Sequence, residues 1–126
     1  MSKKISILIV DDESSVRDSL YNWFIEDGYH VAIAEDSKKA LTILESESFD
    51  IVLADIKMPG MDGLEMLKRI KAIRKDTIVI MMTAFATVET AVQALKDGAF
   101  DYVTKPFDPD DLEEIINKWS SHTHDE

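Results

Sequence analysis

Five residues in this sequence combine a reactive side chain with a position at the end of a short apolar run. They are Asp11, Asp12, Asp55, Thr83 and Lys105. In parallel α/β sheets, ligands bind beyond the carboxyl ends of the strands, where side chains at such positions lie. We take the strand order 2-1-3-4-5 from a known doubly wound α/β fold, in which the first and third strands are neighbours. The three aspartates then converge on one crevice, with the threonine and the lysine beside them.

A cluster of three carboxylates predicts a bound cation, because like charges at close range repel and raise one another's pKa. A single lysine cannot neutralise three acids. An all-oxygen set of ligands suits a hard divalent ion, and Mg²⁺ typically takes one or two carboxylates together with waters and phosphate oxygens. We therefore predict that Asp11, Asp12 and Asp55 bind Mg²⁺ and that the bound ion serves a phosphoryl group.

Each of these residues also has an ordinary structural interpretation when it is taken alone. Asp11 and Asp12 could cap the helix that follows them, and Asp55 could be a turn residue. Thr83 could cap the fourth predicted helix, and Lys105 could be a solvated surface lysine. One shared site explains all five residues at one sheet edge better than five separate coincidences, so the metal and phosphoryl interpretation is preferred.

The elements that must position these residues are short β-rich runs that alternate with stretches of helical periodicity. The predicted strands are residues 5–10, 30–34, 50–54, 77–82 and 99–103. The first, third and fourth runs are apolar nearly throughout, which is typical of strands covered on both faces. The predicted helices contain Val16 to Phe24, Ala40 to Leu44, Leu64 to Ile70, Thr87 to Lys96 and Leu112 to Trp119, and Ser37 and the Asp108–Pro109 pair are predicted to start the second and fifth.

This alternation predicts an α/β fold with right-handed crossovers and helices on both faces of a parallel sheet. The predicted architecture is a flavodoxin-like, doubly wound (βα)5 sandwich with five strands in the order 2-1-3-4-5. Residues 1–120 are predicted to form one domain. Residues 121–126 are predicted to be a polar tail or the start of a linker.

Composition excludes several classes of function. The chain has 126 residues, and 25 acidic against 14 basic residues give a net charge of −11. This charge argues against binding nucleic acid or an anionic membrane surface. The absence of cysteine removes disulfides and thiolate metal sites. Since no run approaches the roughly 18 apolar residues of a membrane span, a cytoplasmic protein is predicted.

Four segments carry a resemblance to a known family. ILIVDDE (7–13), IVLADIKMPGMDGLEML (51–67), IMMTAFA (80–86) and GAFDYVTKPF (98–107) resemble the receiver domain of bacterial two-component response regulators. The resemblance extends from Ile5 to Trp119, with all five signature positions in order. Residues 82–107 are most similar to the NtrC-like and FixJ-like receivers, which precede transcriptional output domains.

The resemblance implies roles for the residues around the predicted metal. Asp55 would be the phosphoacceptor and would form an aspartyl phosphate, with the phosphohistidine of a sensor histidine kinase as the donor. Asp12, Asp55 and the backbone carbonyl of Lys57 would ligate Mg²⁺ directly, and Asp11 would act partly through water. Lys105 would pair with the phosphoryl oxygens.

The resemblance also implies a switch. Thr83 would hydrogen-bond a phosphoryl oxygen, and Tyr102 matches an aromatic switch position. A phosphoryl group on Asp55 would draw the Thr83 hydroxyl inward, and the ring of Tyr102 would move from solvent toward the core. Mobility is predicted to concentrate in residues 84–96 before phosphorylation. The peptide bond between Lys105 and Pro106 matches one that is cis in the family.

The predicted function is a signalling phosphoacceptor in two-component signal transduction, and not an enzyme with an external substrate. It would control an output domain, which could be missing from this chain, or a partner, with transcription as the regulated process, and could form a homodimer through the fourth helix, fifth strand and fifth helix. The alternatives are a stand-alone receiver that acts through protein contacts and an aspartate-nucleophile phosphatase. The phosphatase is disfavoured because residue 57 is lysine where such enzymes usually carry a second acid. A flavin carrier is excluded because acids, and not a phosphate-cradling loop, follow the first strand.

Overall fold

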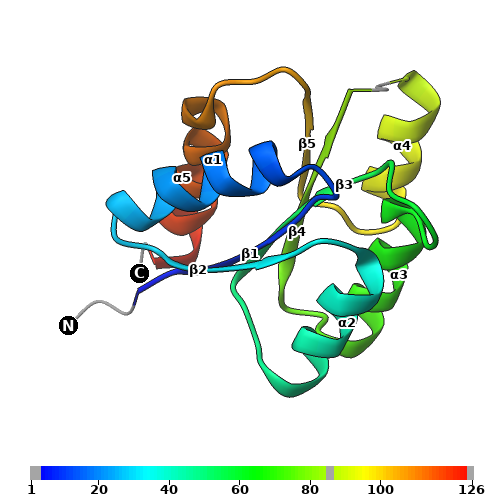
Figure 1. Cartoon of the computed structure of the whole chain (residues 1–126), viewed down its shortest axis with the longest axis horizontal. Coiled ribbons are helices and arrows are strands. Elements are labelled where there is room, and N and C mark those ends of the chain that lie inside the picture. The colour runs from blue at the N-terminus through cyan, green and yellow to red at the C-terminus, as the bar shows by residue number, and fades with distance from the viewer. Residues whose placement is uncertain (1–3, 85–86, 125–126) are drawn as a thin grey trace.

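The computed structural model describes residues 4–84 and 87–124, and its centre is one parallel sheet. The strands are β1 (Ser6–Val10), β2 (His30–Ala34), β3 (Ile51–Asp55), β4 (Ile78–Thr83) and β5 (Asp101–Thr104). They pair in the order β2-β1-β3-β4-β5, and every pair is parallel. The predicted fold class and strand order are confirmed (Figure 1).

Helices cover both faces of the sheet. They are α1 (Ser14–Glu26), α2 (Ser37–Ser46), α3 (Gly63–Ile73), α4 (Val88–Lys96) and α5 (Pro109–His124). The helices α1 and α5 lie on one face, and α2, α3 and α4 lie on the other (Figure 1). The sheet therefore separates two apolar cores, as expected for a doubly wound sandwich.

The apolar runs of the sequence become the buried strands. In β3 every residue is buried, and in β1 and β4 only the first residue is partly exposed. On one face, Leu20 and Phe24 of α1 pack in a cluster with Ile7 and Ile9. Each fully buried side chain of this kind stabilises the fold by about 1.5–3 kcal/mol relative to an exposed one.

Several element ends differ from the prediction by a few residues. Asp36, and not Ser37, is the N-cap of α2, and its carboxylate accepts a hydrogen bond from the Lys39 backbone N–H at 2.8 Å. The strands β3 and β4 each extend one residue further than predicted, so Asp55 and Thr83 are their last residues. The helix α5 runs past residue 120, because polar residues can extend a helix beyond the core that its apolar face covers.

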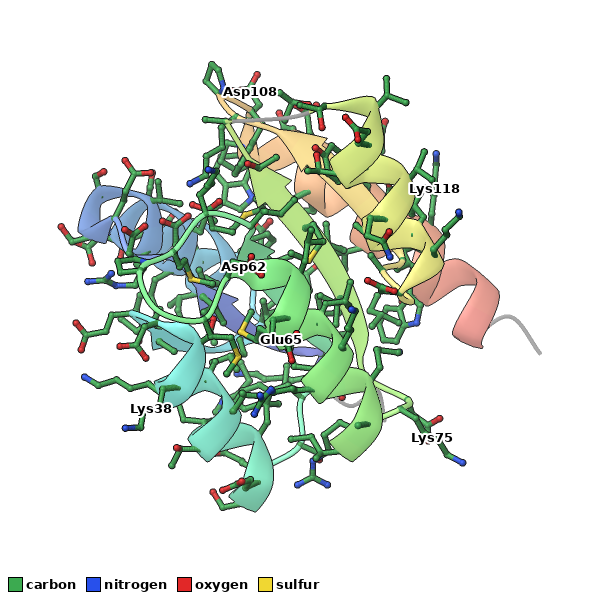
Figure 2. All side chains as sticks on the ribbon, turned by 90° about the vertical axis from the view of Figure 1, so that its right-hand side faces the viewer. Lys38, Asp62, Glu65, Lys75, Asp108 and Lys118 are labelled. Atoms are coloured by element: carbon green, nitrogen blue, oxygen red, sulfur yellow. The ribbon has the colours of Figure 1, made fainter. Side chains whose placement is uncertain are left out.

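Charged side chains lie on the outer surface of the fold. Figure 2 shows Lys38, Lys75 and Lys118 pointing away from the sheet, and all three are exposed. Across residues 4–84 and 87–124, no helix is both long enough and apolar enough to cross a membrane.

Candidate functional site

Three carboxylates meet at the carboxyl ends of β1 and β3. Val10 pairs with Ala54 in the sheet, so the residues that follow them, Asp11 and Asp55, lie side by side. One oxygen from each of Asp11, Asp12 and Asp55 lies within 4.8 Å of the other two. Asp11 is fully buried and Asp55 is 5% exposed, while Asp12 is exposed. The cluster can therefore hold a metal ion with one side open to solvent and to further oxygen ligands.

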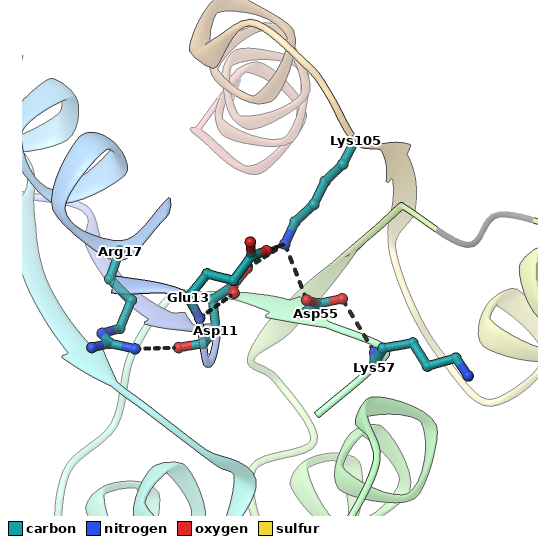
Figure 3. Close-up of polar contacts among 6 residues, drawn as sticks. All are labelled: Asp11, Glu13, Arg17, Asp55, Lys57 and Lys105. Carbon is teal, nitrogen blue, oxygen red and sulfur yellow. Dashed lines mark hydrogen bonds and ion pairs between the residues drawn. The ribbon is translucent and has the colours of Figure 1, made fainter. Parts of the chain in front are cut away.

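Lys105 reaches this cluster from the residue after β5. Its Nζ atom donates hydrogen bonds to Oδ2 of Asp11 at 2.7 Å, to Oδ2 of Asp55 at 3.0 Å and to Oε1 of Glu13 at 3.2 Å (Figure 3). Burial alone would lower the pKa of Lys105, but the bonds to the Asp11 and Asp55 carboxylates outweigh it and raise the pKa well above its ordinary value. The lysine is therefore a permanent cation at neutral pH. The peptide bond between Lys105 and Pro106 is cis.

Asp11 has a hydrogen-bond partner at each of its polar atoms. Its backbone N–H donates to the Ala34 carbonyl at 3.2 Å, and its Oδ1 accepts from the Glu13 backbone N–H at 2.9 Å. Its carbonyl accepts from Nη1 of Arg17 at 2.8 Å. Burial raises the pKa of the Asp11 carboxyl, against the lowering effect of its bonds to Lys105 and Glu13. The N-cap of α1 is Glu13, whose side chain makes no capping bond, so neither aspartate is the N-cap residue.

The loop between β3 and α3 is closed tightly beside Asp55. The Gly63 N–H donates to the Ile56 carbonyl at 2.7 Å, and a Cβ atom on Gly63 would lie 2.7 Å from Cα of Ile56. Only glycine fits there, because real Cβ atoms do not approach backbone atoms so closely. The buried Ser37 side chain donates from Oγ to the Met61 carbonyl at 2.9 Å, which ties the loop to α2.

Lys57 lies in this loop, and its backbone contacts the phosphoacceptor candidate. Its N–H donates to Oδ1 of Asp55 at 3.2 Å, and Lys105 donates to Oδ2, so both carboxylate oxygens accept a hydrogen bond (Figure 3). The Lys57 side chain is exposed. The carboxylate of Asp55 is thus held in one orientation by a donor on each oxygen.

The two candidate switch residues lie on the neighbouring strands. Thr83 ends β4, is fully buried and pairs with Thr104 of β5. Tyr102 is half-buried against the core cluster beneath α2, α3 and α4, and its hydroxyl lies 3.1 Å from Oγ1 of Thr90. Its ring is therefore only partly exposed to solvent. Residues 85 and 86, part of the segment for which mobility is predicted, lie outside the described residues.

Thr90 belongs to the first turn of α4. The Thr87 side chain accepts a hydrogen bond from the Thr90 N–H at 3.1 Å, and Oγ1 of Thr90 accepts one from the Thr87 N–H at 3.1 Å. This reciprocal capping box confirms Thr87 as the start of the helix. The hydroxyl of Tyr102 therefore contacts the residue that closes the first turn of α4.

A groove of about 440 Å³ opens beside Lys105. It runs between the start of α1 and the segment that connects β5 to α5, and its apolar walls include Val16, Leu20, Pro106 and Phe107. A partner that approaches Asp55 could place an apolar surface in this groove.

Sequence reasoning missed three of these contacts, those of Arg17, Ser37 and Thr90. The sequence does offer a signal for Arg17. A cation in the first turn of a helix is disfavoured by the helix dipole, so an arginine there indicates a specific contact. The other two contacts depend on how α2 and α4 are rotated against the sheet, which no local pattern shows.

A family model for the response regulator receiver domain matches residues 7–117. The transcriptional regulatory protein ZraR of Escherichia coli K12 is 44% identical over 124 residues, which are 95% of this chain and 27% of ZraR. FixJ of Bradyrhizobium diazoefficiens is 39% identical over 116 residues, with 92% of this chain and 57% of FixJ covered. NtrC of Salmonella typhimurium is 40% identical over 116 residues, with 92% and 25% covered. The chain thus spans about a quarter of the length of ZraR and NtrC.

A similar solved structure is the CheY-like response regulator receiver domain protein from Methanospirillum hungatei JF-1. Its TM-score is 0.89 at 38% sequence identity, and the match covers 92% of this chain and 93% of that one. The similarity therefore extends over nearly the whole fold.

Proposed function

The chain belongs to the family of response regulator receiver domains, and from this premise we propose that it accepts a phosphoryl group on Asp55 from the phosphohistidine of a sensor histidine kinase. The observation that carries the proposal is the arrangement around Asp55. Its carboxylate is placed by donors on both oxygens, belongs to the acid cluster and pairs with the partly buried Lys105. The domain then acts as a signalling phosphoacceptor, and not as an enzyme with an external substrate.

The donor set fits Mg²⁺ as the cofactor. Asp12, Asp55 and the backbone carbonyl of Lys57 would hold the ion directly, with Asp11 partly through water. Carboxylate and carbonyl oxygens are the ligands that Mg²⁺ prefers, and three carboxylates with one lysine leave a net negative site for a divalent cation. The bound ion would supply charge neutralisation for the phosphoryl oxygens.

The residues of the chain supply position and charge for the transfer. An oxygen of Asp55 attacks phosphorus and forms an O–P bond as the N–P bond to the donor imidazole breaks, and the imidazole leaves with the bonding pair. A carboxylate is a weak nucleophile, so the rate depends on orientation and on cations near the transferred oxygens. In the proposed mechanism Lys105 exchanges its bonds to Asp11 and Asp55 for bonds to the phosphoryl oxygens.

The groove beside Lys105 supports a docking position for the kinase. It opens next to the residue that neutralises Asp55, and its walls are largely apolar. A helix of the kinase that carries the phosphohistidine would bury its apolar face in this groove and direct the imidazole toward Asp55.

The signal is proposed to leave through α4, β5 and α5. The phosphoryl group would draw in the Thr83 hydroxyl through a charge-assisted hydrogen bond, and Tyr102 would follow. The outer side of α4 exposes Val88, Val92 and Leu95, which could contact an output domain or a second copy. Because ZraR, FixJ and NtrC are named as transcriptional regulators, we propose that the output is transcription regulation.

Intact mass spectrometry after incubation with phosphoramidate and Mg²⁺ tests the chemistry. The wild-type chain should gain one phosphoryl group, and this gain should disappear in Asp55→Asn and in excess chelator. Asp62→Asn is the matched control, because it changes an exposed acid in the same loop that only caps α3. Labelling of Asp55→Asn to the wild-type level would refute the assignment.

Amide exchange tests the switch. Beryllofluoride, a phosphoryl mimic, should change protection in Val88–Lys96 and at Tyr102 as well as around Asp55. A change confined to the loops around Asp55 would show that the signal does not take this route.

A further inference from the structure

From the contact between Arg17 and Asp11, we infer that Arg17 is a positioning residue for the metal ligand Asp12. The inference rests on the proposed function, since it concerns Mg²⁺ binding at the acid cluster. Arg17 does not belong to that cluster, and its guanidinium contacts the backbone of the loop that carries the acids (Figure 3).

The contact immobilises the peptide unit that leads into Asp12. Nη1 of Arg17 donates to the Asp11 carbonyl at 2.8 Å, and this carbonyl belongs to the peptide plane shared by Asp11 and Asp12. The remaining polar atoms of Asp11 are bound by Ala34, Glu13 and Lys105. With all of these bonds made, neither the strand end nor the peptide plane can rotate freely.

Asp12 needs such support more than its neighbours do. Asp55 ends a strand and Asp11 is fully buried, whereas Asp12 is exposed. Within the part of the chain that the structure describes, no hydrogen bond or ion pair holds the Asp12 carboxylate. Its direction therefore follows from the backbone on either side of it, and the Arg17 bond is what fixes that backbone from the side of α1.

An arginine is unusual at this place in a helix. Arg17 lies in the first turn of α1, where the helix dipole disfavours a cation. Its charge is directed to a neutral carbonyl, and a hydrogen bond from a charged donor is stronger than one between neutral groups. The planar guanidinium also fixes direction better than the flexible ammonium of lysine.

Isothermal titration of Mg²⁺ into the whole chain is the decisive measurement. We expect Arg17→Gln to raise the Kd for Mg²⁺ by about tenfold, the scale of effects seen when a group that orients a metal ligand is removed. Arg17→Lys, which keeps the charge and the ability to donate a hydrogen bond, should recover part of this loss. Arg69→Gln is the matched control, since Arg69 is an exposed arginine of α3 that pairs with Glu65, and the Kd of this variant should stay at the wild-type value.

Phosphorylation by phosphoramidate adds a readout that a merely structural role would not move. In Arg17→Gln the Mg²⁺ concentration for half-maximal rate should rise by the same factor, and the rate at saturating Mg²⁺ should remain near wild type, because Asp55 and Lys105 are unchanged. Melting in chelator shows that each variant is folded.

The inference is overturned if wild type binds Mg²⁺ and Arg17→Gln binds it with the same Kd. It is also overturned if Arg69→Gln weakens binding as much as Arg17→Gln, since net charge would then be the cause. A wild-type chain that binds no Mg²⁺ would instead refute the proposed function, and this result is distinct from the other two.

Discussion

Replacement of Asp12 by asparagine is expected to change the stability of the fold in opposite directions with and without Mg²⁺. One oxygen each of Asp11, Asp12 and Asp55 lies within 4.8 Å of the others. Lys105 forms ion pairs with Asp11 and Asp55, at 2.7 and 3.0 Å. Without metal, the charge of Asp12 repels two neighbours, so its removal should stabilise the fold. With metal, the same charge is a ligand, so its removal should destabilise it.

The magnitudes follow from simple electrostatics and linkage. Two like charges about 4 Å apart repel by about 1 kcal/mol in a water-like dielectric, which is the appropriate one for an exposed group. An unfolding entropy of about 2.1 cal/mol/K per residue makes 1 kcal/mol equal to about 4 °C in a chain of 126 residues. Mg²⁺ at about 100 times its Kd adds about 2.7 kcal/mol to wild type, or about 10 °C. If the variant binds about a hundredfold more weakly, it gains only about 0.4 kcal/mol.

Thermal melts followed by circular dichroism give the melting temperatures of wild type and of Asp12→Asn, each in chelator and in excess Mg²⁺. In chelator, Asp12→Asn should melt about 4 °C above wild type, and in Mg²⁺ it should melt below it. Asp18→Asn is the control, because Asp18 is an exposed acid of α1 outside the cluster, and the Mg²⁺ shift of this variant should equal that of wild type. Equal Mg²⁺ shifts in wild type and Asp12→Asn would refute a site that includes Asp12. A lower melting temperature of Asp12→Asn in chelator would refute the repulsion argument.

Three further predictions concern the surroundings of the cluster. Glu13→Gln removes an exposed partner that Lys105 must leave in order to bind the phosphoryl oxygens. Initial rates of phosphorylation should therefore rise, by at most about fivefold, since exposed ion pairs are worth about 0.2–1 kcal/mol. A slower rate would contradict this reasoning. Gly63→Ala should lower the unfolding free energy, measured in urea, by about 1–3 kcal/mol, because the new Cβ meets the backbone of Ile56; an unchanged midpoint would contradict the packing argument. Because burial raises the pKa of Asp11, protons should compete with Mg²⁺, and the Kd from calorimetry should increase as the pH falls toward this pKa. As the pH falls over the same range, Asp11 becomes protonated and the metal-free fold no longer carries the energetic cost of a buried charge. A Kd that does not depend on pH would contradict competition between protons and Mg²⁺.

The layers of the fold could be predicted because the sequence patterns are strong. The runs that become β1, β3 and β4 are apolar on both faces, and helical periodicity fills the intervals between them. The sequence predicts the ends of β3 and β4 one residue too early, because the first polar residue after each apolar run is expected to lie outside the strand. Asp55 continues the pairing with Met82, and Thr83 continues it with Thr104. Backbone pairing, and not side-chain polarity, decides where these strands end.

The convergence of the acids was predicted from a strand order taken from the known fold, and not from the local sequence. Once β1 and β3 are neighbours, Asp11 and Asp55 must meet, and Lys105 has the length to reach them. Family membership, including the similarity to NtrC and FixJ, is confirmed by the comparisons. The contacts of Ser37 and Thr90 could not be predicted, because they depend on side-chain rotamers and on the rotation of each helix.

The bond between Tyr102 and Thr90 gives the proposed switch a physical connection to α4. Thr90 shares its hydroxyl between the capping box with Thr87 and the hydroxyl of Tyr102. If Tyr102 moves when Thr83 is drawn toward a phosphoryl group, the first turn of α4 loses a hydrogen-bond partner. The helix is short and exposes Val88 at 80%, so few packing contacts resist a change at this end. In the proposed switch, a local change at Asp55 reaches the exposed apolar side of α4 through a rearrangement of hydroxyl partners.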